Sequence, residues 1–196
     1  MRADALRNRR RLLEAAEEVF SRDGTAAPTE EVARQAGVGI GTLFRHFPTK
    51  EALLEALLTQ RVTRIAGAAE RASAEGDAGQ ALRTLLVEVV GESAQKRAYA
   101  DALGGVGNTA SQELVTAQKR ARAALDALLR RAQRQGSIRD DIETGDLIAL
   151  IVGALEAAEH VGWDPGVRDR TLRVLLDGLR AAPALATPAA PGDLPG

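Results

Sequence analysis

The stretch PTEEVARQAGVGIGTLFRHFPTK, from Pro28 to Lys50, constrains the fold more than any other part of the chain. A helix is predicted from Thr29, its N-cap, to Gln35, because two glutamates follow the cap and suit the positive end of a helix. Gly37 can adopt the left-handed conformation that closes it. A second helix is predicted from Ile40 to Phe47, stopped by Pro48. Two helices joined by a short glycine turn form a helix-turn-helix, whose second helix can enter a DNA major groove.

Two helices this short need outside support. Their apolar residues must pack against each other and against a neighbouring helix. The region from about Leu6 to Arg22 predicts that third helix, because apolar residues recur there at helical spacing, namely Leu12, Leu13, Ala16, Val19 and Phe20. The first 47 residues therefore predict a compact three-helix head.

Composition favours an all-α protein with an aliphatic core. Apolar residues make up 45% and aromatic residues only 3% of the 196 residues, and runs typical of strands are absent. The chain has no cysteine, which excludes disulfides, cysteine-based zinc sites and thiol switches. No run approaches 18 apolar residues, so we expect neither a membrane span nor secretion but a cytoplasmic protein.

Charge is unevenly distributed along the chain. The net charge is −1 overall, but residues 1–50 carry +2 and the remainder −3. Five arginines lie in the first eleven residues, namely Arg2, Arg7, Arg9, Arg10 and Arg11. They suit either an N-terminal arm on DNA phosphates or a solubilising, disordered terminus, and the adjacent helix-turn-helix favours the arm.

The rest of the chain predicts long helices. Thr49 should cap a connector helix, and further helices are expected at about 78–99, 111–134, 145–161, capped by Thr144, and 167–180. The fold class is therefore all-α with about nine helices. Apolar residues cover more than one face of the last two helices, which predicts a homodimer through a four-helix bundle. We expect a DNA-binding domain at 1–48, a helical body at 49–182 and a disordered tail at 183–196.

The segment LGGVGNTA, from Leu103 to Ala110, is rich in glycine and contains a G-x-G-x-x-A pattern. Such a pattern binds dinucleotides only between a strand and a helix. The preceding residues are helical in character, so we interpret the match as coincidental and the segment as a connection beside a pocket.

The run AGVGIGTLFRHFPTKEALL, from Ala36 to Leu54, resembles the DNA-binding signature of the TetR family of bacterial regulators. The similarity extends from about Arg9 into the helix that begins near Lys50. The resemblance implies that the second helix enters the major groove. It also implies a small-molecule pocket in the body, with ligand binding changing the separation of two heads in a dimer.

Several residues are candidates for DNA contact on this resemblance. Thr29 and Thr42 suit phosphate contacts at helix starts, and His46 and Lys50 would flank the backbone, although His46 could instead be a packed cap. Ile40 could touch a thymine methyl group, and Arg45 could read guanine or bind phosphate. Phe44 stands where the family more often has tyrosine, and Gly39 and Gly41 stand where larger residues are common. Glu30 could accept from cytosine but suits an ordinary first-turn acid.

We therefore expect few side-chain contacts, close backbone approach at Gly41, and a contribution from DNA shape. The candidate pocket residues are Tyr99, Leu103, Asn108, Gln112, Glu156, His160 and Trp163. Each also has a structural interpretation as a core, interface or turn residue. The expected partners are operator DNA, a second copy of the chain and an effector that is largely apolar, with no cofactor.

The chain lacks the H-E-x-x-H, G-x-S-x-G and P-loop motifs and has only two histidines, so no enzyme is predicted. The function expected is sequence-specific transcriptional regulation, with repression relieved by a ligand. The alternatives are a DNA-binding protein without ligand control and a helical interaction protein.

Overall fold

The computed structural model describes residues 2–74, 76–93, 110–161 and 164–181. Within these ranges the chain forms eight α-helices and no β-strand beyond one antiparallel bridge between Ile138 and Arg180. The helices are α1 (Arg2–Asp23), α2 (Thr29–Gln35), α3 (Ile40–His46), α4 (Lys50–Ala72), α5 (Ala78–Ser93), α7 (Gln112–Arg134), α8 (Thr144–Val161) and α9 (Pro165–Gly178). The predicted all-α fold is confirmed.

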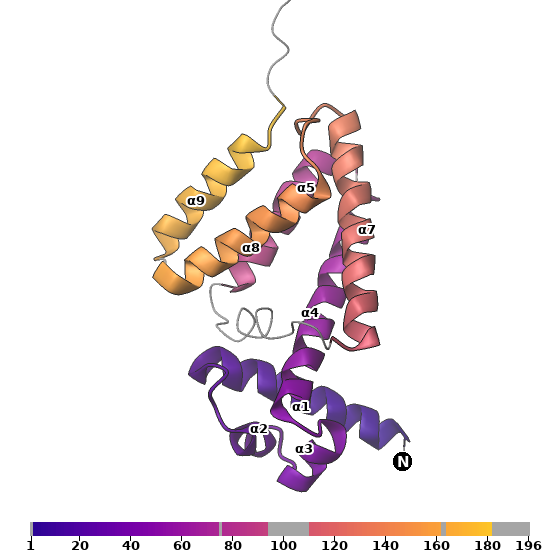
Figure 1. Cartoon of the computed structure of the whole chain (residues 1–196), viewed down its shortest axis with the longest axis vertical. Helices are drawn as coiled ribbons and strands as arrows, with labels where there is room; N and C mark the ends of the chain where they lie inside the picture. Colours follow the sequence, from indigo (N-terminus) through magenta and orange to yellow (C-terminus); the bar gives the residue numbers. More distant parts are fainter. Residues whose placement is uncertain (1, 75, 94–109, 162–163, 182–196) are drawn as a thin grey trace, which may run out of the picture.

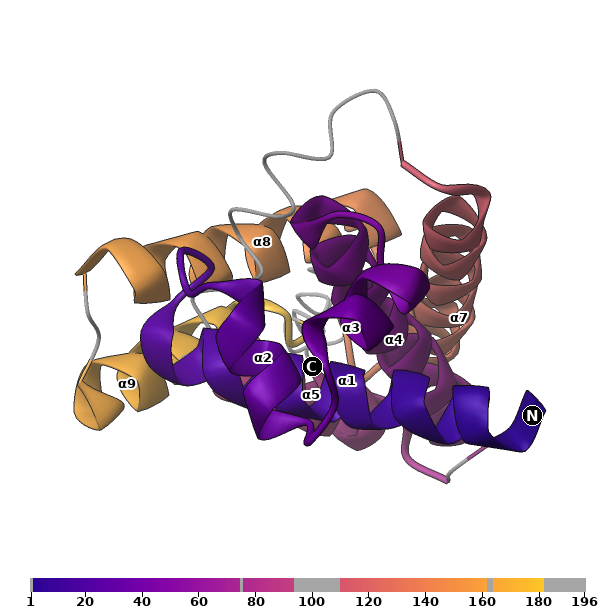
Figure 2. The same cartoon turned by 90° about the horizontal axis from the view of Figure 1, so that it is seen from below.

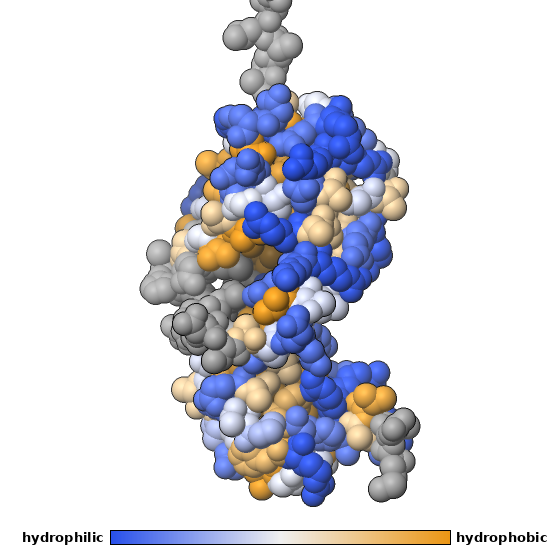
Figure 3. All heavy atoms as spheres, turned by 45° about the vertical axis from the view of Figure 1, so that its right-hand side comes forward, coloured by the Kyte–Doolittle hydropathy of each residue, from blue (hydrophilic) through white to orange (hydrophobic). Residues whose placement is uncertain are grey.

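The molecule has a head and a body joined by α4. Helices α1, α2 and α3 form the head at the bottom of Figure 1, and α4 runs upward from it beside α7. Helices α8 and α9 lie on the other side of the body. Hydrophilic residues cover much of the face shown in Figure 3, and apolar residues reach the surface there in separate patches.

The head has its own hydrophobic core. Leu12, Val19 and Phe20 of α1 and Leu43 of α3 are completely buried. Val32 and Ala33 of α2, Phe47 after α3, and Leu53 and Leu57 of α4 belong to the same cluster. The prediction that α1 supports the two short helices is therefore confirmed, and the first turns of α4 complete the head.

The body core is aliphatic throughout its described part. It draws Leu82, Leu85 and Leu86 from α5, Leu125, Leu128 and Leu129 from α7, Leu147 from α8 and Leu179 after α9. Alanines such as Ala69, Ala124 and Ala132 let the helices approach closely. The low aromatic content of the sequence therefore leads to a core of leucine and alanine.

Helices α4 and α7 run parallel and are tied together along their length. The amide of Ser111, the N-cap of α7, donates to the Glu55 carboxylate of α4 over 2.6 Å. Further up, Arg120 forms two hydrogen bonds to Glu70, at 2.7 and 2.6 Å. At the far end Arg131 donates to the Ser73 carbonyl after α4. The two helices therefore form one unit with contacts at both ends and the middle.

Most predicted helix ends are close to those observed. Gly37 and Gly136 have positive φ angles of 65° and 68°, as expected for residues that close a helix. The Thr49 side chain caps α4 by accepting from the Ala52 amide. The predicted helix at 78–99 is described only as far as Ser93, and the glycine-rich segment and the tail lie outside the described residues.

Two predicted caps were wrong. Thr29 is the first residue of α2, and the N-cap position is held by Pro28 without a side-chain hydrogen bond. Thr144 is likewise inside α8, where its buried hydroxyl donates to Asp126 of α7 over 2.8 Å. A buried hydroxyl needs a partner, and here the neighbouring carboxylate serves better than the local backbone. The last helix begins at Pro165, with Asp164 as cap, two residues earlier than predicted.

Helices α8 and α9 expose apolar side chains. Val174 of α9 is 74% exposed, and Leu150 and Val152 of α8 are about 40% exposed. The opposite sides of these helices enter the body through Leu147, Ala154 and Leu172. Each helix therefore carries an apolar surface beyond the one that its own subunit covers.

Candidate nucleic-acid interface

The turn between α2 and α3 fixes the second helix against the head. The Gly37 amide donates to the Arg34 carbonyl over 3.1 Å, and the Val38 amide donates to the Ala33 carbonyl over 3.0 Å. These bonds close α2 before the chain enters α3 at Ile40. Leu43, with no exposed surface, anchors α3 in the head core. The predicted helix-turn-helix is confirmed.

One face of α3 is open to solvent. Ile40 and Phe44 are 37% and 41% exposed, and Gly41 and Arg45 are exposed beside them. Positions i and i+4 are neighbours on a helix, so the two apolar side chains share one surface. Apart from its chain neighbours and the backbone of its own helix, Gly41 has no atom within 4 Å of the place where a Cβ would stand. This surface, defined as Ile40, Gly41, Phe44 and Arg45, is called the reading face below.

The remaining predicted contact residues lie around the reading face with less exposure. Thr42 and His46 are half-buried, and the His46 ring lies 6.4 Å from the Phe47 ring at an angle of 48°. Thr29 is only 8% exposed at the start of α2. Glu30 beside it is exposed. The structure thus brings Thr42 and His46 to the edges of the reading face but leaves little of Thr29 accessible.

The basic N-terminus is helical from Arg2, and its role as an arm on DNA phosphates stays a prediction. Residues from Arg2 onward belong to α1, and the N-terminal end of this helix projects beyond α2 and α3 in both ribbon views (Figures 1 and 2). Asp4 lies in the first turn, where an acid suits the helix dipole, and it forms an ion pair with Arg7. The first arginines of the chain therefore belong to α1, which begins earlier than the predicted start near Leu6.

Several cations of the head have acidic partners. Arg10 pairs with Glu14, Arg22 with Asp23 and Arg34 with Glu31, and hydrogen bonds from Arg34 lower the pKa of Glu31. In contrast, Arg11 and Arg45 form no ion pair with any described residue, and both are exposed. The Arg11 guanidinium lies beside the turn, 3.0 Å from where a Cβ on Gly37 would be. Arg11 and Arg45 are therefore the head cations best placed for an outside anion.

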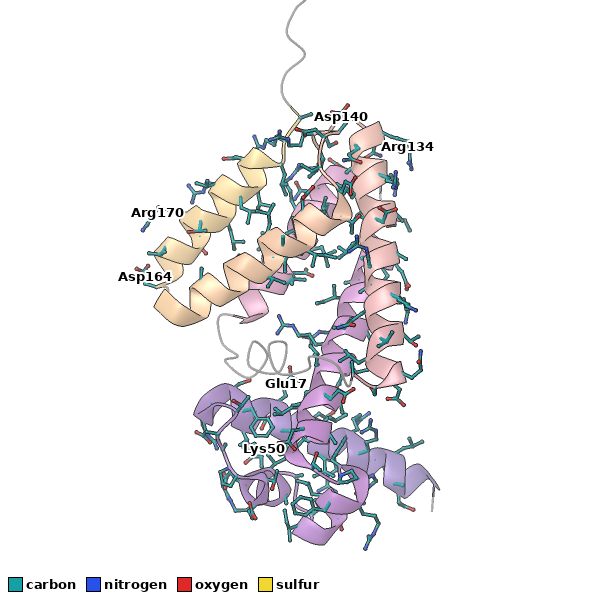
Figure 4. The ribbon with its side chains drawn as sticks, in the orientation of Figure 1. Glu17, Lys50, Arg134, Asp140, Asp164 and Arg170 are labelled. Carbon is teal, nitrogen blue, oxygen red and sulfur yellow. The ribbon has the colours of Figure 1, made fainter. Side chains whose placement is uncertain are left out.

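Two further cations of the head point inward. The Lys50 ammonium donates to the Ala27 carbonyl over 2.7 Å and lies 5.7 Å from the Phe20 ring centroid. The Arg9 guanidinium carbon lies 4.7 Å from the Phe47 ring centroid. Lys50 was predicted to flank the DNA backbone, but it lies among the head helices (Figure 4).

Sequence reasoning missed Arg9 as an individual residue and missed Arg61 of α4 altogether. Arg61 is only 7% exposed and donates to the Val89 carbonyl of α5 over 3.2 Å. A signal for Arg61 was present, because it continues the apolar stripe formed by Leu54, Leu57 and Leu58. Arg9 lies among several arginines, and nothing in the sequence shows which of them stacks on a ring.

Most of the candidate pocket residues lie outside the described residues, so the pocket stays a prediction. Tyr99, Leu103, Asn108 and Trp163 lie outside the described residues, as do the side chains of Glu156 and His160. Gln112 is described and exposed in the first turn of α7, where its amide lies 3.4 Å from the Thr116 hydroxyl. It lines a shallow surface groove between α4 and α7 together with Thr59, Thr63 and Arg120.

Among the described residues, no group of three or more histidine, cysteine or acidic side chains could hold a metal ion. None of the described helices is long and apolar enough to cross a membrane.

Comparison with known proteins identifies the family. A model of the bacterial regulatory proteins of the tetR family matches residues 12–57, and a model of the C-terminal domain of SbtR-like transcriptional regulators matches residues 77–181. The chain belongs to the TetR family. It is a transcriptional regulator of that family, whose members bind DNA, form dimers and in general have no catalytic activity.

Solved structures match along nearly the whole chain. A TetR regulator from Mycobacterium vanbaalenii is 38% identical, with a TM-score of 0.68, covering 91% of this chain and 98% of the other. One from Streptomyces coelicolor is 36% identical, with a TM-score of 0.67, covering 89% and 99%. A regulator from Rhodococcus sp. RHA1, covering 89% and 96%, has a TM-score of 0.73 at 20% identity, which shows the shared fold alone.

Curated relatives match over a much shorter stretch. The regulator UidR of Escherichia coli K12 is 38% identical over 61 residues, which are 31% of this chain and 31% of UidR. A Staphylococcus aureus regulator is 41% identical over 54 residues, 27% of this chain and 29% of the other. The chain thus spans under a third of the length of these curated relatives.

Proposed function

We propose that the protein is a homodimeric repressor that binds a pseudo-palindromic operator and is released from it by a small molecule. The reading face carries this proposal. Ile40 and Phe44 are large apolar residues on an exposed helix, next to an arginine without an ion pair among the described residues. This combination suits the edges of base pairs in a major groove, where methyl groups and hydrogen-bond acceptors lie side by side.

Each part of the reading face has a proposed role. Arg45 donates to guanine or to a phosphate, and Ile40 contacts a thymine methyl group. Gly41 lets the helix backbone approach the groove, and Phe44 adds apolar contact without the hydroxyl of a tyrosine. Thr42 and His46, at the edges, bind phosphates, and Thr29 does so from the start of α2 through what little of it is exposed. Lys50 binds a phosphate with an ammonium donor that its hydrogen bond to the Ala27 carbonyl leaves free.

The second copy is proposed to dock on α8 and α9. Val174, Leu150 and Val152 give these helices an apolar surface facing away from their own core. A two-fold axis through this surface packs α8 and α9 of one copy against α8 and α9 of the other, which forms a four-helix bundle. The same axis sets two reading faces against two half-sites, which is why the operator should be a pseudo-palindrome.

Ligand control is proposed to act through α4. This helix shares residues with both cores, Leu53 and Leu57 with the head and Ala69 and Ala72 with the body. A ligand that binds one arrangement of the body more tightly than the other shifts the separation of the two heads, whereas a ligand with equal affinity for both shifts nothing. A largely apolar effector suits the aliphatic core of the body.

Selection of bound sequences from a random DNA library by the purified protein tests the proposal. We expect enrichment of an inverted repeat whose half-sites lie about one helical turn apart or a multiple of it. Loss of enrichment in a variant with Ile40→Ala and Arg45→Ala would assign the recognition to the reading face. No enrichment at any salt concentration would contradict a sequence-specific regulator and favour an interaction protein.

Sedimentation tests the dimer separately. Val174→Asp should give a monomer, because it places a charge within a buried apolar surface. Leu6→Asp is a matched control, since Leu6 is 69% exposed but lies in the head. Truncation before Pro183 should leave the dimer intact. A dimer that survives Val174→Asp, or a monomer after the truncation, would show that the interface lies elsewhere.

A further inference from the structure

Arg61 is a buried cation at the point where α4 passes from the head into the body. Leu57, one turn before it on the same face of α4, belongs to the head core. Ala69, two turns after it, belongs to the body core. Arg61 itself is only 7% exposed, and an arginine is rarely buried this far unless other groups of the protein bind it. Arg61 therefore places a charge in the row of side chains that connects the two cores.

On the body side, Arg61 binds the end of α5. Its Nη2 donates to the Val89 carbonyl, in the last described turn of α5, over 3.2 Å. Val89 belongs to the body core, and Val90 beside it clusters with Ala154 of α8 and Leu172 of α9. The hydrogen bond therefore connects α4 to the turn of α5 that packs against both helices of the proposed dimer surface.

On the head side, Arg61 shares a small hollow with Glu17 of α1. The residues that line this hollow are Glu17, Leu57, Gln60, Arg61 and Arg64. Glu17 is half-buried and lies on the side of the head that faces the body (Figure 4). A carboxylate and a guanidinium that are partly removed from water attract each other more strongly than they would in open solvent. A movement of the Arg61 guanidinium therefore changes the force on α1.

The alternative is that Arg61 contributes only to stability. An apolar side chain of similar length could fill the same boundary, because replacement of a buried charge by apolar groups is often neutral or stabilising. The hydrogen bond of Arg61, in contrast, depends on where α5 lies. A shift of α5 by about 1 Å away from α4 would lengthen the bond beyond the range of a hydrogen bond. The contact is therefore either made or broken, and the position of α5 decides which.

We propose that Arg61 couples the position of α5 to the orientation of the head. In the arrangement described above, the guanidinium lies between the Val89 carbonyl and the hollow that contains Glu17. When α5 shifts away, the guanidinium loses the carbonyl and is drawn toward Glu17, which changes the angle between α1 and α4 and turns the reading face. Arg61 is thus a positioning residue that acts on DNA binding through α1. This inference rests on the proposed ligand control, and it names the contact through which that control reaches the head.

Hydrogen exchange in α5 tests the coupling with operator DNA as the probe. Coupling between two sites is reciprocal, so binding of the selected operator by the head must alter α5. In the wild type we expect operator binding to change the exchange rates of amides 89–93 by about fivefold or more. In Arg61→Met, which keeps an apolar stem but loses the guanidinium, this change should fall below about twofold. Arg71→Met removes a charge from an exposed position of α4 and should behave like the wild type.

A second experiment needs no DNA. Glu17→Gln keeps the size of the side chain but removes its charge from the head. In the free protein we expect this substitution to change the exchange rates of amides 89–93 by about fivefold, although these amides lie in the body. In an Arg61→Met background the same substitution should change them little, because the connecting contact is missing. Arg61→Lys, which keeps a charge but not the planar fork of donors, should retain part of the effect.

The opposite results would overturn the inference. An operator-induced change in α5 that is absent from the wild type, or that persists in Arg61→Met, would leave Arg61 with a role in stability alone. Loss of the change in Arg64→Met but not in Arg61→Met would assign the coupling to the neighbouring arginine. Equal effects of Glu17→Gln in both backgrounds would show that Glu17 and Arg61 act independently. Failure of the proposed function is a distinct result, because a protein that selects no operator still shows in its free state whether Glu17 acts on α5 through Arg61.

Discussion

The head and the body of this regulator hold their helices together by different means. The head combines short helices, two buried phenylalanines and cations that point inward onto them. The body combines long helices whose described core is entirely aliphatic, with an ion pair at the surface between α4 and α7. Directional contacts thus fix the orientation of the helices in the small head. Buried apolar area and close packing stabilise the large body.

The difference matches what each part has to do. A reading face must meet base edges within a fraction of an ångström, which favours contacts with defined geometry. An effector pocket has to change shape, and aliphatic side chains can repack with little loss.

The largest expected loss of stability comes from shortening a buried side chain in each core. Phe20→Ala in the head should cost about 3–5 kcal/mol, and Leu128→Ala in the body about 2–5 kcal/mol. If the two regions are stabilised separately, each substitution should lower one of two transitions in calorimetry. Leu6→Ala, at an exposed position of α1, is the control and should change little. A single transition that both variants lower equally would show that head and body unfold as one unit.

Removal of the one long donor of the reading face should affect specificity more than stability. Arg45→Ala should reduce discrimination between the selected site and random DNA by about 1–3 kcal/mol, with little change in melting temperature. Arg134→Ala, exposed at the far end of α7, is the matched control in the body. Equal losses on both kinds of DNA, measured by titration at one salt concentration, would rule out a base-reading role for Arg45.

Two glycines should respond in opposite directions. A Cβ on Gly79 of α5 would lie 2.3 Å from the Ser137 Cβ, so Gly79→Ala should destabilise the body by about 1–3 kcal/mol. Gly41→Ala meets open space and should stabilise the free protein by about 0.5–1 kcal/mol. The same change should weaken DNA binding if the groove approaches the backbone there. Unchanged DNA affinity in Gly41→Ala would show that Gly41 allows no close approach.

The smallest effect should come from the ion pair between α4 and α7. Hydrogen bonds from Arg120 lower the pKa of Glu70, so the carboxylate is stabilised in the folded state. Its contribution to stability is present above the ordinary pKa of about 4.3 and is lost as the pH falls through the lower, folded-state value. The melting temperature of Glu70→Gln should therefore lie slightly below that of the wild type at neutral pH and converge with it in acid. Glu113→Gln is the control, and a constant difference across the range would contradict the assignment.

Much of the fold followed from local signals in the sequence. Gly37 and Thr49 mark helix ends through backbone or cap requirements, and those ends were confirmed. The predicted cap at Thr144 was wrong because a hydroxyl can either cap a helix or bind a carboxylate that is distant in sequence. The structure shows the second use, with Asp126 as the partner. A tertiary partner of this kind leaves no local trace in the sequence.

The site was less predictable than the fold for the same reason. Sequence placed Ile40 and Arg45 on the recognition helix, because their position depends only on helical periodicity. The direction in which Lys50 and Arg9 point depends on rings contributed by distant parts of the chain. Charge alone suggests an outward cation, and only the packing of the head shows that these two turn inward.

The length of α4 has a geometric consequence for regulation. Its 23 residues, at 1.5 Å each, span about 34 Å between the two cores that share it. Because α7 is bonded to it at Glu55, at Glu70 and just beyond its end, the pair can tilt as a lever but has little freedom to slide. A rotation of about 5° at the body displaces the other end by about 3 Å, close to the 3.4 Å rise of one base step. An angular change too small to disturb either core is therefore large enough to move a reading face out of register with DNA.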